Sequence, residues 1–177
     1  MVQLTPPVGP QDKAQGSATA PVTIVEYGDY ECPACGRIYW TIKVLQNAMG
    51  DDLRFVFRNF PLAEVHSHAE GAAEIAEEAA DAGLFWPMHD MLFENQAALD
   101  SASLVSYGER LGLDRQSLLV ALRGSHSQRI RDDFLGGVRS GVNGTPTLFI
   151  NGYRYDGPLD PVSILAVLRA SPYVESE

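Results

Sequence analysis

The sequence predicts an α/β fold built from a β-α-β half and a β-β-α half, with a helical subdomain inserted between them. Near the N-terminus, two apolar stretches rich in β-branched and aromatic residues flank an amphipathic stretch, the pattern of two strands joined by a helix. Toward the C-terminus, two short strand-like stretches precede another amphipathic stretch. We expect an extended lead-in at 1–20, an α/β domain formed by 21–62 and 143–172, and the helical subdomain at 63–142.

The first half contains the clearest strand–helix–strand pattern. Val22–Tyr27 is β-branched and aromatic, which predicts a buried strand. Cys32–Met49 predicts a helix, because its apolar residues recur at helical spacing, and Leu53–Phe60 alternates between apolar residues and arginines as a strand does. A helix of this length allows a right-handed crossover, so we expect the two strands to be parallel. The lead-in before them is expected to be loosely ordered, with a short extended stretch at Val2–Thr5.

The middle segment predicts five helices, each with apolar residues three or four positions apart. The first carries a stripe of alanines and ends near Gly83. Pro87 suits the first turn of the second helix, and Asp114 suits the N-cap of the fourth. The residues expected to face the core of the last four helices are Met88, Met91, Leu92, Leu104, Tyr107, Leu111, Leu118, Leu119, Leu122, Ile130, Phe134 and Val138.

The last third returns to strands. Thr147–Ile150 and Tyr153–Asp156 predict a hairpin, since the Asn151-Gly152 pair between them tolerates the positive φ angles of a type I′ turn. Asp160 then suits an N-cap, and the proline after it suits the first position of a final helix.

Composition excludes several classes of protein. The 177 residues carry a net charge of −10, and their basic residues are scattered, so phosphate backbones and anionic membrane surfaces would repel the chain. No apolar run approaches the roughly 18 residues of a membrane span. We expect no nucleic-acid partner and no membrane insertion. The first twenty residues lack the apolar core of a signal peptide, which predicts a cytoplasmic protein, or a periplasmic or extracellular one if an export signal has been removed.

The two cysteines, Cys32 and Cys35, point to chemistry rather than to stabilisation. A disulfide enclosing only two residues removes little entropy from the unfolded chain. At a helix N-terminus, unpaired N–H groups and the helix dipole favour a thiolate, which makes Cys32 the attacking sulfur. Cys35, one turn further in, would be shielded and would resolve a mixed disulfide. Pro33 is tolerated in this first turn because its missing N–H would have been unpaired.

Charged neighbours of the pair act in both directions. Asp29 and Glu31 oppose ionisation of Cys32, whereas Arg37 supports it. The alternative use of a C-x-x-C pair is half of a zinc site, which needs two further ligands. The only nitrogen candidates are histidines that we otherwise expect at helix starts or on the surface: His66, His68, His89 and His126.

Several segments resemble the DsbA-like branch of the thioredoxin superfamily, in particular its single-domain bacterial members. These segments are VTIVEYGDYECPAC, FRNFPL, LFWPMHDMLFENQ and GTPT, and the resemblance spans about residues 20–170. It implies a thioredoxin-like fold and a dithiol/disulfide oxidoreductase without an organic cofactor or a metal. It also implies that Pro146 is a cis-proline opposite the cysteines. In the family, the residue before that proline, here Thr145, tunes the affinity for substrate and the reduction potential of the cysteine pair. The substrate-contacting residues it implies are Pro33, Ala34, Thr145 and Pro146.

The resemblance also places Glu26 as a buried acid beneath the cysteines. A carboxylate within the apolar VTIVEY strand is already unusual, because burial raises its pKa and suits it to moving a proton to or from Cys35. The alternative is that the strand turns Glu26 toward solvent. The Pro-Ala dipeptide contains no histidine or tyrosine to stabilise the thiolate, so the direction of electron flow stays open.

We therefore expect thiol–disulfide exchange with protein or low-molecular-weight thiols, served by an unidentified redox partner, and a monomeric chain that is an oxidase or reductase rather than an isomerase. The alternative is a non-catalytic binding or chaperone module, with an apolar groove around Trp40, Phe85 and Trp86, or a zinc-binding protein. Relatives that activate glutathione use one serine or cysteine, so the intact pair disfavours them.

Overall fold

The computed structural model describes residues 1–170, so the predicted α/β domain's last two residues, 171–172, lie outside the described residues. One five-stranded sheet has the order β1-β3-β2-β4-β5. Its strands are β1 (Lys13–Gln15), β2 (Val22–Gly28), β3 (Leu53–Asn59), β4 (Thr147–Ile150) and β5 (Tyr153–Tyr155). The helices are α1 (Pro33–Met49), α2 (Ala69–Asp81), α3 (Phe85–Glu94), α4 (Ser101–Arg110), α5 (Arg115–Ala121), α6 (Ser127–Arg139) and α7 (Pro161–Ala170).

The centre of the sheet is a parallel pair, as the sequence predicts. β2 and β3 run parallel, and every other pairing in the sheet is antiparallel. A short 3₁₀ turn at Gly50–Asp52 links α1 to β3. The predicted hairpin turn is also confirmed: Asn151 has φ 47° and Gly152 has φ 83°, both positive as a type I′ turn requires.

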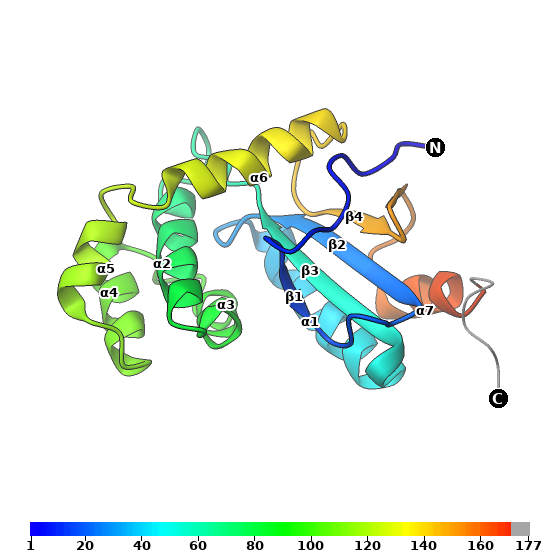
Figure 1. The fold of residues 1–177 in the computed structure, drawn as a ribbon, viewed down its shortest axis with the longest axis horizontal. Helices are drawn as coiled ribbons and strands as arrows, with labels where there is room; N and C mark the ends of the chain where they lie inside the picture. Colours follow the sequence, from blue (N-terminus) through cyan, green and yellow to red (C-terminus); the bar gives the residue numbers. More distant parts are fainter. Residues whose placement is uncertain (171–177) are drawn as a thin grey trace.

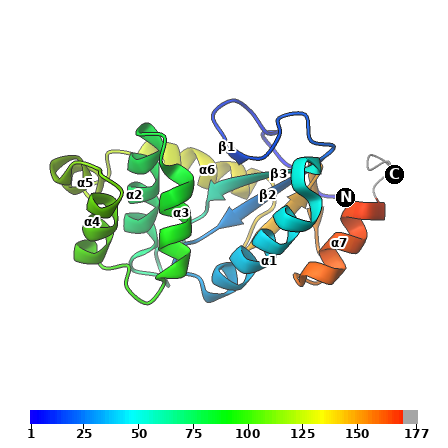
Figure 2. The same ribbon diagram turned by 90° about the horizontal axis from the view of Figure 1, so that it is seen from below.

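Helices cover both faces of the sheet (Figure 1). α1 and α7 lie side by side on one face, as Figure 2 also shows, and bury Ile38, Ile42 and Ile164 against the strands. α2–α5 group together beyond the end of the sheet, and α6 runs back across the opposite face (Figures 1 and 2). On that face Phe134 of α6 stacks on Phe60, with ring centroids 4.2 Å apart.

The N-terminal lead-in is more ordered than the sequence predicts. β1 adds to the sheet edge by pairing with β3, and the extended stretch near Gln3 forms a bridge to Tyr153. Leu4 is buried on the face covered by α6. The buried guanidinium of Arg58 holds this segment by hydrogen bonds to both carboxylate oxygens of Asp12 and to the carbonyls of the first two prolines, Pro6 and Pro7. The expectation of a loosely ordered lead-in is therefore wrong, because a buried arginine on β3 binds it.

Candidate active site

The nucleophile expected at the start of a helix lies there. Cys32 is the N-cap of α1, with extended backbone angles, and its carbonyl accepts the N–H of Gly36 at 3.1 Å. Pro33 occupies the first helical position, where it needs no hydrogen-bond partner. The turn that follows β2 leads directly into α1, so this strand–helix connection places the Cys32 sulfur at the N-terminus of the helix.

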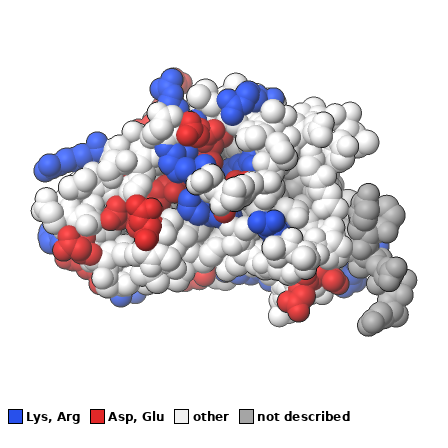
Figure 3. All heavy atoms as spheres, viewed as in Figure 1, with Lys and Arg blue, Asp and Glu red and all other residues white. Residues whose placement is uncertain are grey.

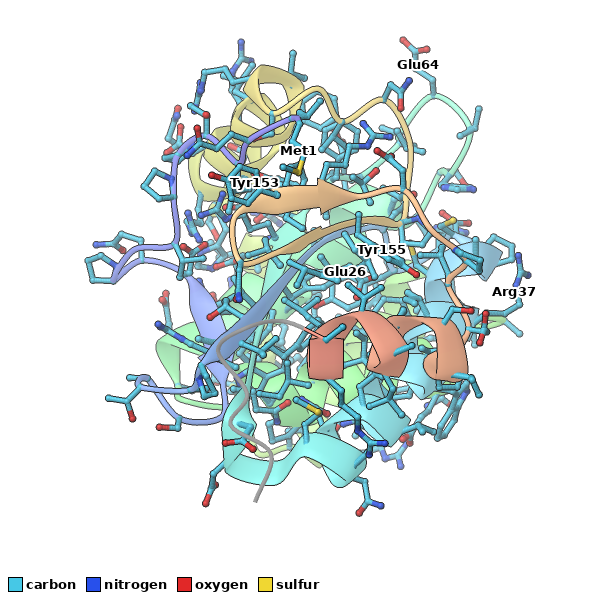
Figure 4. All side chains as sticks on the ribbon, turned by 90° about the vertical axis from the view of Figure 1, so that its right-hand side faces the viewer. Met1, Glu26, Arg37, Glu64, Tyr153 and Tyr155 are labelled. Carbon is cyan, nitrogen blue, oxygen red and sulfur yellow. The ribbon has the colours of Figure 1, made fainter. Side chains whose placement is uncertain are left out.

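Cys35 and Glu26 lie beneath Cys32 in the interior. Cys35 is fully buried, and its sulfur accepts the backbone N–H of Asp29 at 3.5 Å. Burial raises the pKa of the Cys35 thiol well above its usual value, and hydrogen bonding to Cys32 adds to this. The strand keeps Glu26 inside rather than turning it to solvent, and Figure 4 shows it among the interior side chains. Burial, together with the Cys32 charge, raises the pKa of Glu26 to about 8.

Pro146 follows a cis peptide bond from Thr145, as the sequence resemblance implies. Both residues are half-buried in the turn before β4, and the Thr145 carbonyl lies 3.5 Å from the Cys32 sulfur. The loop of the C-terminal half therefore meets the helix start of the N-terminal half. Both halves of the fold therefore contact the reactive sulfur.

The surroundings of Cys32 favour its thiolate. Hydrogen bonding from Cys35, from the Thr145 side chain and from the backbone N–H groups of Cys35 and Ala34 outweighs the effect of burial and lowers the pKa of Cys32 to about 5. Among residues 1–170 the buried Thr145 hydroxyl has no hydrogen-bond partner of its own, which leaves it available to donate to a sulfur anion at Cys32. Arg37 is not among these main causes, since it is exposed and points away from the interior (Figure 4). Neutral donors and the first helical turn, rather than a cation on α1, stabilise the anion.

The dipeptide between the cysteines is open to a partner. Pro33 is exposed and Ala34 is half-exposed. Pro33, Ala34 and Pro146 are uncharged and each keeps part of its surface exposed, which suits contact with an extended chain.

Gln96 is a site residue that sequence reasoning missed. It follows α3, and its side-chain amide donates to the carbonyls of Tyr30 and Cys32 at 2.8 and 2.9 Å. A Cβ on Gly36 would collide with the Gln96 carbonyl oxygen, so the glycine leaves room for this contact. The only sequence signal was that Gln96 ends the LFWPMHDMLFENQ segment, which resembles the family without indicating a role.

A second contact joins the turn before Cys32 to the loop after β3. The buried Asp29 carboxylate accepts from the backbone N–H groups of Glu31 and Leu62 and bonds to the His66 ring at 2.8 Å. Asp29 is therefore a hydrogen-bond centre of the turn. The sequence suggested only that its charge opposes the thiolate.

The histidines differ partly from expectation. His68 and His126 immediately precede α2 and α6, as predicted for helix starts. His89 is instead 3% exposed within a cluster of aromatic rings, and burial lowers its pKa to about 3. Within the described residues, three side chains whose ligand atoms gather closely enough to hold a metal ion are found once, and that group contains neither cysteine: Glu78, Asp81 and His126.

The expected apolar groove around two tryptophans and Phe85 does not form. Phe85 is only 5% exposed, and Trp86 packs against the core while its indole N–H donates to the carbonyl of Ala14 at 3.2 Å. Only Trp40 of the three presents most of its surface, at 57%. The sequence could not show that the lead-in covers Trp86.

Comparison with known proteins agrees with this geometry. Residues 9–170 match the sequence profile of a family described as Thioredoxin. The chain belongs to the thioredoxin family. A thioredoxin-like oxidoreductase from Silicibacter pomeroyi superposes on this thioredoxin-family protein with a TM-score of 0.81 at 21% identity, covering 94% of this chain and 95% of the other. BdbD from Bacillus subtilis gives 0.78 at 22% identity, covering 90% and 91%. These likenesses show the fold, a mixed α/β arrangement of the thioredoxin type.

Similar curated sequences carry a different name. The Na⁺/H⁺ antiporter NhaA 1 of Salinispora arenicola is 41% identical over 175 residues, which is 97% of this chain but 26% of the antiporter. This thioredoxin-family protein thus spans about a quarter of the length of those relatives. In residues 1–170, no helix is both long and apolar enough to traverse a bilayer.

Proposed function

We propose that this protein is a DsbA-like protein-disulfide oxidoreductase that transfers its Cys32–Cys35 disulfide to dithiol substrates. The observation that carries the proposal is the placement of Cys32: an acidic thiol at the first turn of α1, against a buried second cysteine and the Pro146 loop. A stabilised thiolate and a resolving thiol are two requirements of exchange, and this site supplies both, while Cys32 keeps 7% of its surface exposed.

The transfer takes two steps. A substrate thiolate attacks the Cys32 sulfur, the Cys32–Cys35 bond breaks, and the electron pair leaves on Cys35, which takes a proton that the nearby Glu26 carboxyl supplies. The second substrate thiolate then attacks the substrate sulfur of the mixed disulfide and releases Cys32 as a thiolate. The substrate loses two electrons and gains a disulfide, and the protein becomes the dithiol.

The acidity of Cys32 favours this direction. A thiol whose pKa is about 5 stays ionised at neutral pH, which stabilises the dithiol form and makes the disulfide form a stronger oxidant. A glutathione-reduced cytoplasm would keep such a couple reduced. We therefore propose that it turns over in an oxidising compartment, which corresponds to the exported alternative rather than to the cytoplasmic location expected from the sequence.

Replacing each cysteine tests the assignment. We expect Cys32→Ser to abolish oxidation of a reduced model peptide and of reduced, unfolded protein, because no sulfur remains to accept the substrate thiolate. Cys35→Ser should instead accumulate mixed disulfides through Cys32, visible by mass spectrometry and reversed by dithiothreitol. A Cys32→Ser protein with full oxidase activity would contradict the proposal.

The binding-module alternative predicts a different outcome. A scaffold that only holds a client or zinc would bind without turnover, so metal analysis is run beside the exchange assay. Zinc bound at one per chain with no exchange would favour that alternative, whereas exchange by the metal-free protein favours the enzyme.

A further inference from the structure

The loop after β3 contacts the turn that precedes the redox-active cysteines. Asp29, in that turn, is 1% exposed and its backbone N–H reaches the Cys35 sulfur at 3.5 Å. Its carboxylate binds the loop through the N–H of Leu62 at 2.9 Å and the His66 Nδ1 at 2.8 Å. The His66 ring is thus tied to a residue three positions before Cys32, although it lies 37 positions from Asp29 along the chain.

The surroundings of His66 favour the protonated form of its ring. The hydrogen bond to Asp29 raises the pKa of His66 above its usual value despite partial burial, and the charges of Asp29, Cys32 and Glu31 add to this. These three groups all belong to the turn between β2 and α1, while the loop neighbours Glu64 and His68 are exposed. His66 is therefore an imidazolium through the acidic range in which Cys32 titrates.

We propose that His66 is a positioning residue for the exchange reaction, whose ring, fixed by Asp29, supplies positive charge to the Cys32 thiolate from outside the C-x-x-C turn. This rests on the proposed function and identifies a cation that the sequence did not. Pro33 and Ala34 carry no charge, so stabilisation by an ionic group has to come from another segment.

Two physical effects support this role. Charge coupling is reciprocal: the Cys32 anion is one of the charges that favour protonated His66, so protonated His66 favours the Cys32 anion. This effect is smaller than that of the hydrogen-bond donors around Cys32. The ring also neutralises the buried Asp29 carboxylate. Asp29 contacts both cysteines through its backbone, since its N–H reaches the Cys35 sulfur at 3.5 Å and its carbonyl accepts the Cys32 N–H at 3.1 Å. Loss of His66 removes a cation and leaves an uncompensated anion, and both changes disfavour the thiolate.

The experiment measures the pH dependence of Cys32 alkylation by iodoacetamide in the reduced protein, with mass spectrometry to identify the labelled cysteine. We expect His66→Ala and His66→Gln to move the midpoint upward by about half to one pH unit, below the roughly 1–3 units that a charge in direct contact produces, and to slow alkylation at acidic pH several-fold. Gln can still donate to Asp29 without a charge, so a shift in His66→Gln separates charge from hydrogen bonding. It also carries the test if the alanine variant folds poorly.

His68→Ala is the matched control, because His68 lies in the same loop with an exposed side chain and no side-chain cap to α2. Its midpoint should equal that of the parent. An unchanged midpoint in His66→Gln, or an equal shift in His68→Ala, would overturn the inference. The readout needs no protein substrate: a shifted midpoint in a protein without oxidase activity would contradict the proposed function alone, and an active protein with an unshifted midpoint would contradict this inference alone.

Discussion

At the scale of residues, the reactive site depends on two sulfurs and one carboxyl held in different environments. Cys32 is acidic because donors surround it, whereas burial opposes ionisation of Cys35 and Glu26. The three groups thus keep their protons at different pH values. This separation lets one sulfur attack or leave as an anion while the other exchanges a proton with the carboxyl.

The buried carboxyl of Glu26 should destabilise the fold in a pH-dependent way. Its pKa is raised to about 8, so above its ordinary value near 4.5 the unfolded chain ionises while the folded protein stays protonated. Glu26→Gln removes this cost, and its free energy of unfolding at neutral pH should exceed that of the parent by roughly 3 kcal/mol. The two proteins should have similar stability near pH 4. Urea denaturation of the reduced proteins at both pH values measures the difference.

The same substitution should slow exchange, because Cys35 loses its proton partner. The exposed Glu64 provides the control, since Glu64→Gln changes a carboxylate that water already solvates (Figure 4). For the stability measurement, the contradicting result is a Glu26→Gln protein whose free energy of unfolding equals that of the parent at both pH values. That result would show that Glu26 is not a buried acid with a raised pKa.

The two cysteines and the buried acid of the site were predictable from the sequence. Cys32 and Cys35 were apparent from their spacing and their place before a helix, and Glu26 from its position in an apolar strand. Asp29 and His66 were not, because the contact between them joins segments 37 positions apart and depends on how the loop folds back.

At the scale of elements, the helical segment contributes directly to the redox turn. Gln96, just after α3, hydrogen-bonds the carbonyls of Tyr30 and Cys32, and Gly36 on α1 makes room for it. The positions of the strands and helices could be predicted from the periodicity of apolar residues. A contact between the end of one helix and the start of another could not be predicted in this way. Periodicity indicates which face of a helix is buried and not which residue it meets.

The contact between Gly36 and Gln96 predicts strong non-additivity. Gly36→Ala should destabilise the parent by about 1–3 kcal/mol, because the new methyl group displaces an amide that satisfies two buried carbonyls. In a Gln96→Ala background the same change should be neutral or stabilising by up to about 1 kcal/mol, since alanine is the better helix former. A double-mutant cycle by urea denaturation measures this. Equal costs of Gly36→Ala in both backgrounds would contradict the geometry.

At the scale of the whole molecule, the N-terminal segment completes the sheet and covers part of the core. β1 extends the sheet edge, and Arg58 on β3 binds Asp12 through both carboxylate oxygens. Charge does not gather into a basic stripe on the face seen in Figure 3, where acidic and basic groups are interspersed. A polar lead-in looks disordered in sequence because the arginine that orders it belongs to a distant strand.

The pair of Asp12 and Arg58 should contribute strongly to stability. Asp12→Ala leaves a buried guanidinium without its counter-charge, so we expect a loss of about 3–5 kcal/mol in the free energy of unfolding. Burial alone would raise the pKa of Asp12, but hydrogen bonds from Arg58 and the Gly9 N–H lower it. The ion pair therefore stabilises the fold fully at pH values above the ordinary pKa of aspartate. This stabilisation is lost as the pH falls through the lowered pKa of Asp12 in the folded protein.

The exposed pair of Arg154 and Asp156 provides the comparison. Its Nε–Oδ1 distance is the same, 2.8 Å, but Arg154 bonds only one carboxylate oxygen, and the Asp156 side chain is 72% exposed. Asp156→Ala should cost less than about 1 kcal/mol. Equal losses in the two variants, measured by thermal and urea denaturation, would show that the lead-in is not held by the buried pair.

The pKa of Cys32 in the reduced parent protein is the most direct test of the account. Ultraviolet absorbance of the thiolate, followed against pH with Cys32→Ser as the blank, should show a transition centred at about pH 5 that the blank lacks. A midpoint near that of a free thiol, about 8.5, would contradict the claim that the first turn of α1 and its neighbours hold this sulfur as an anion.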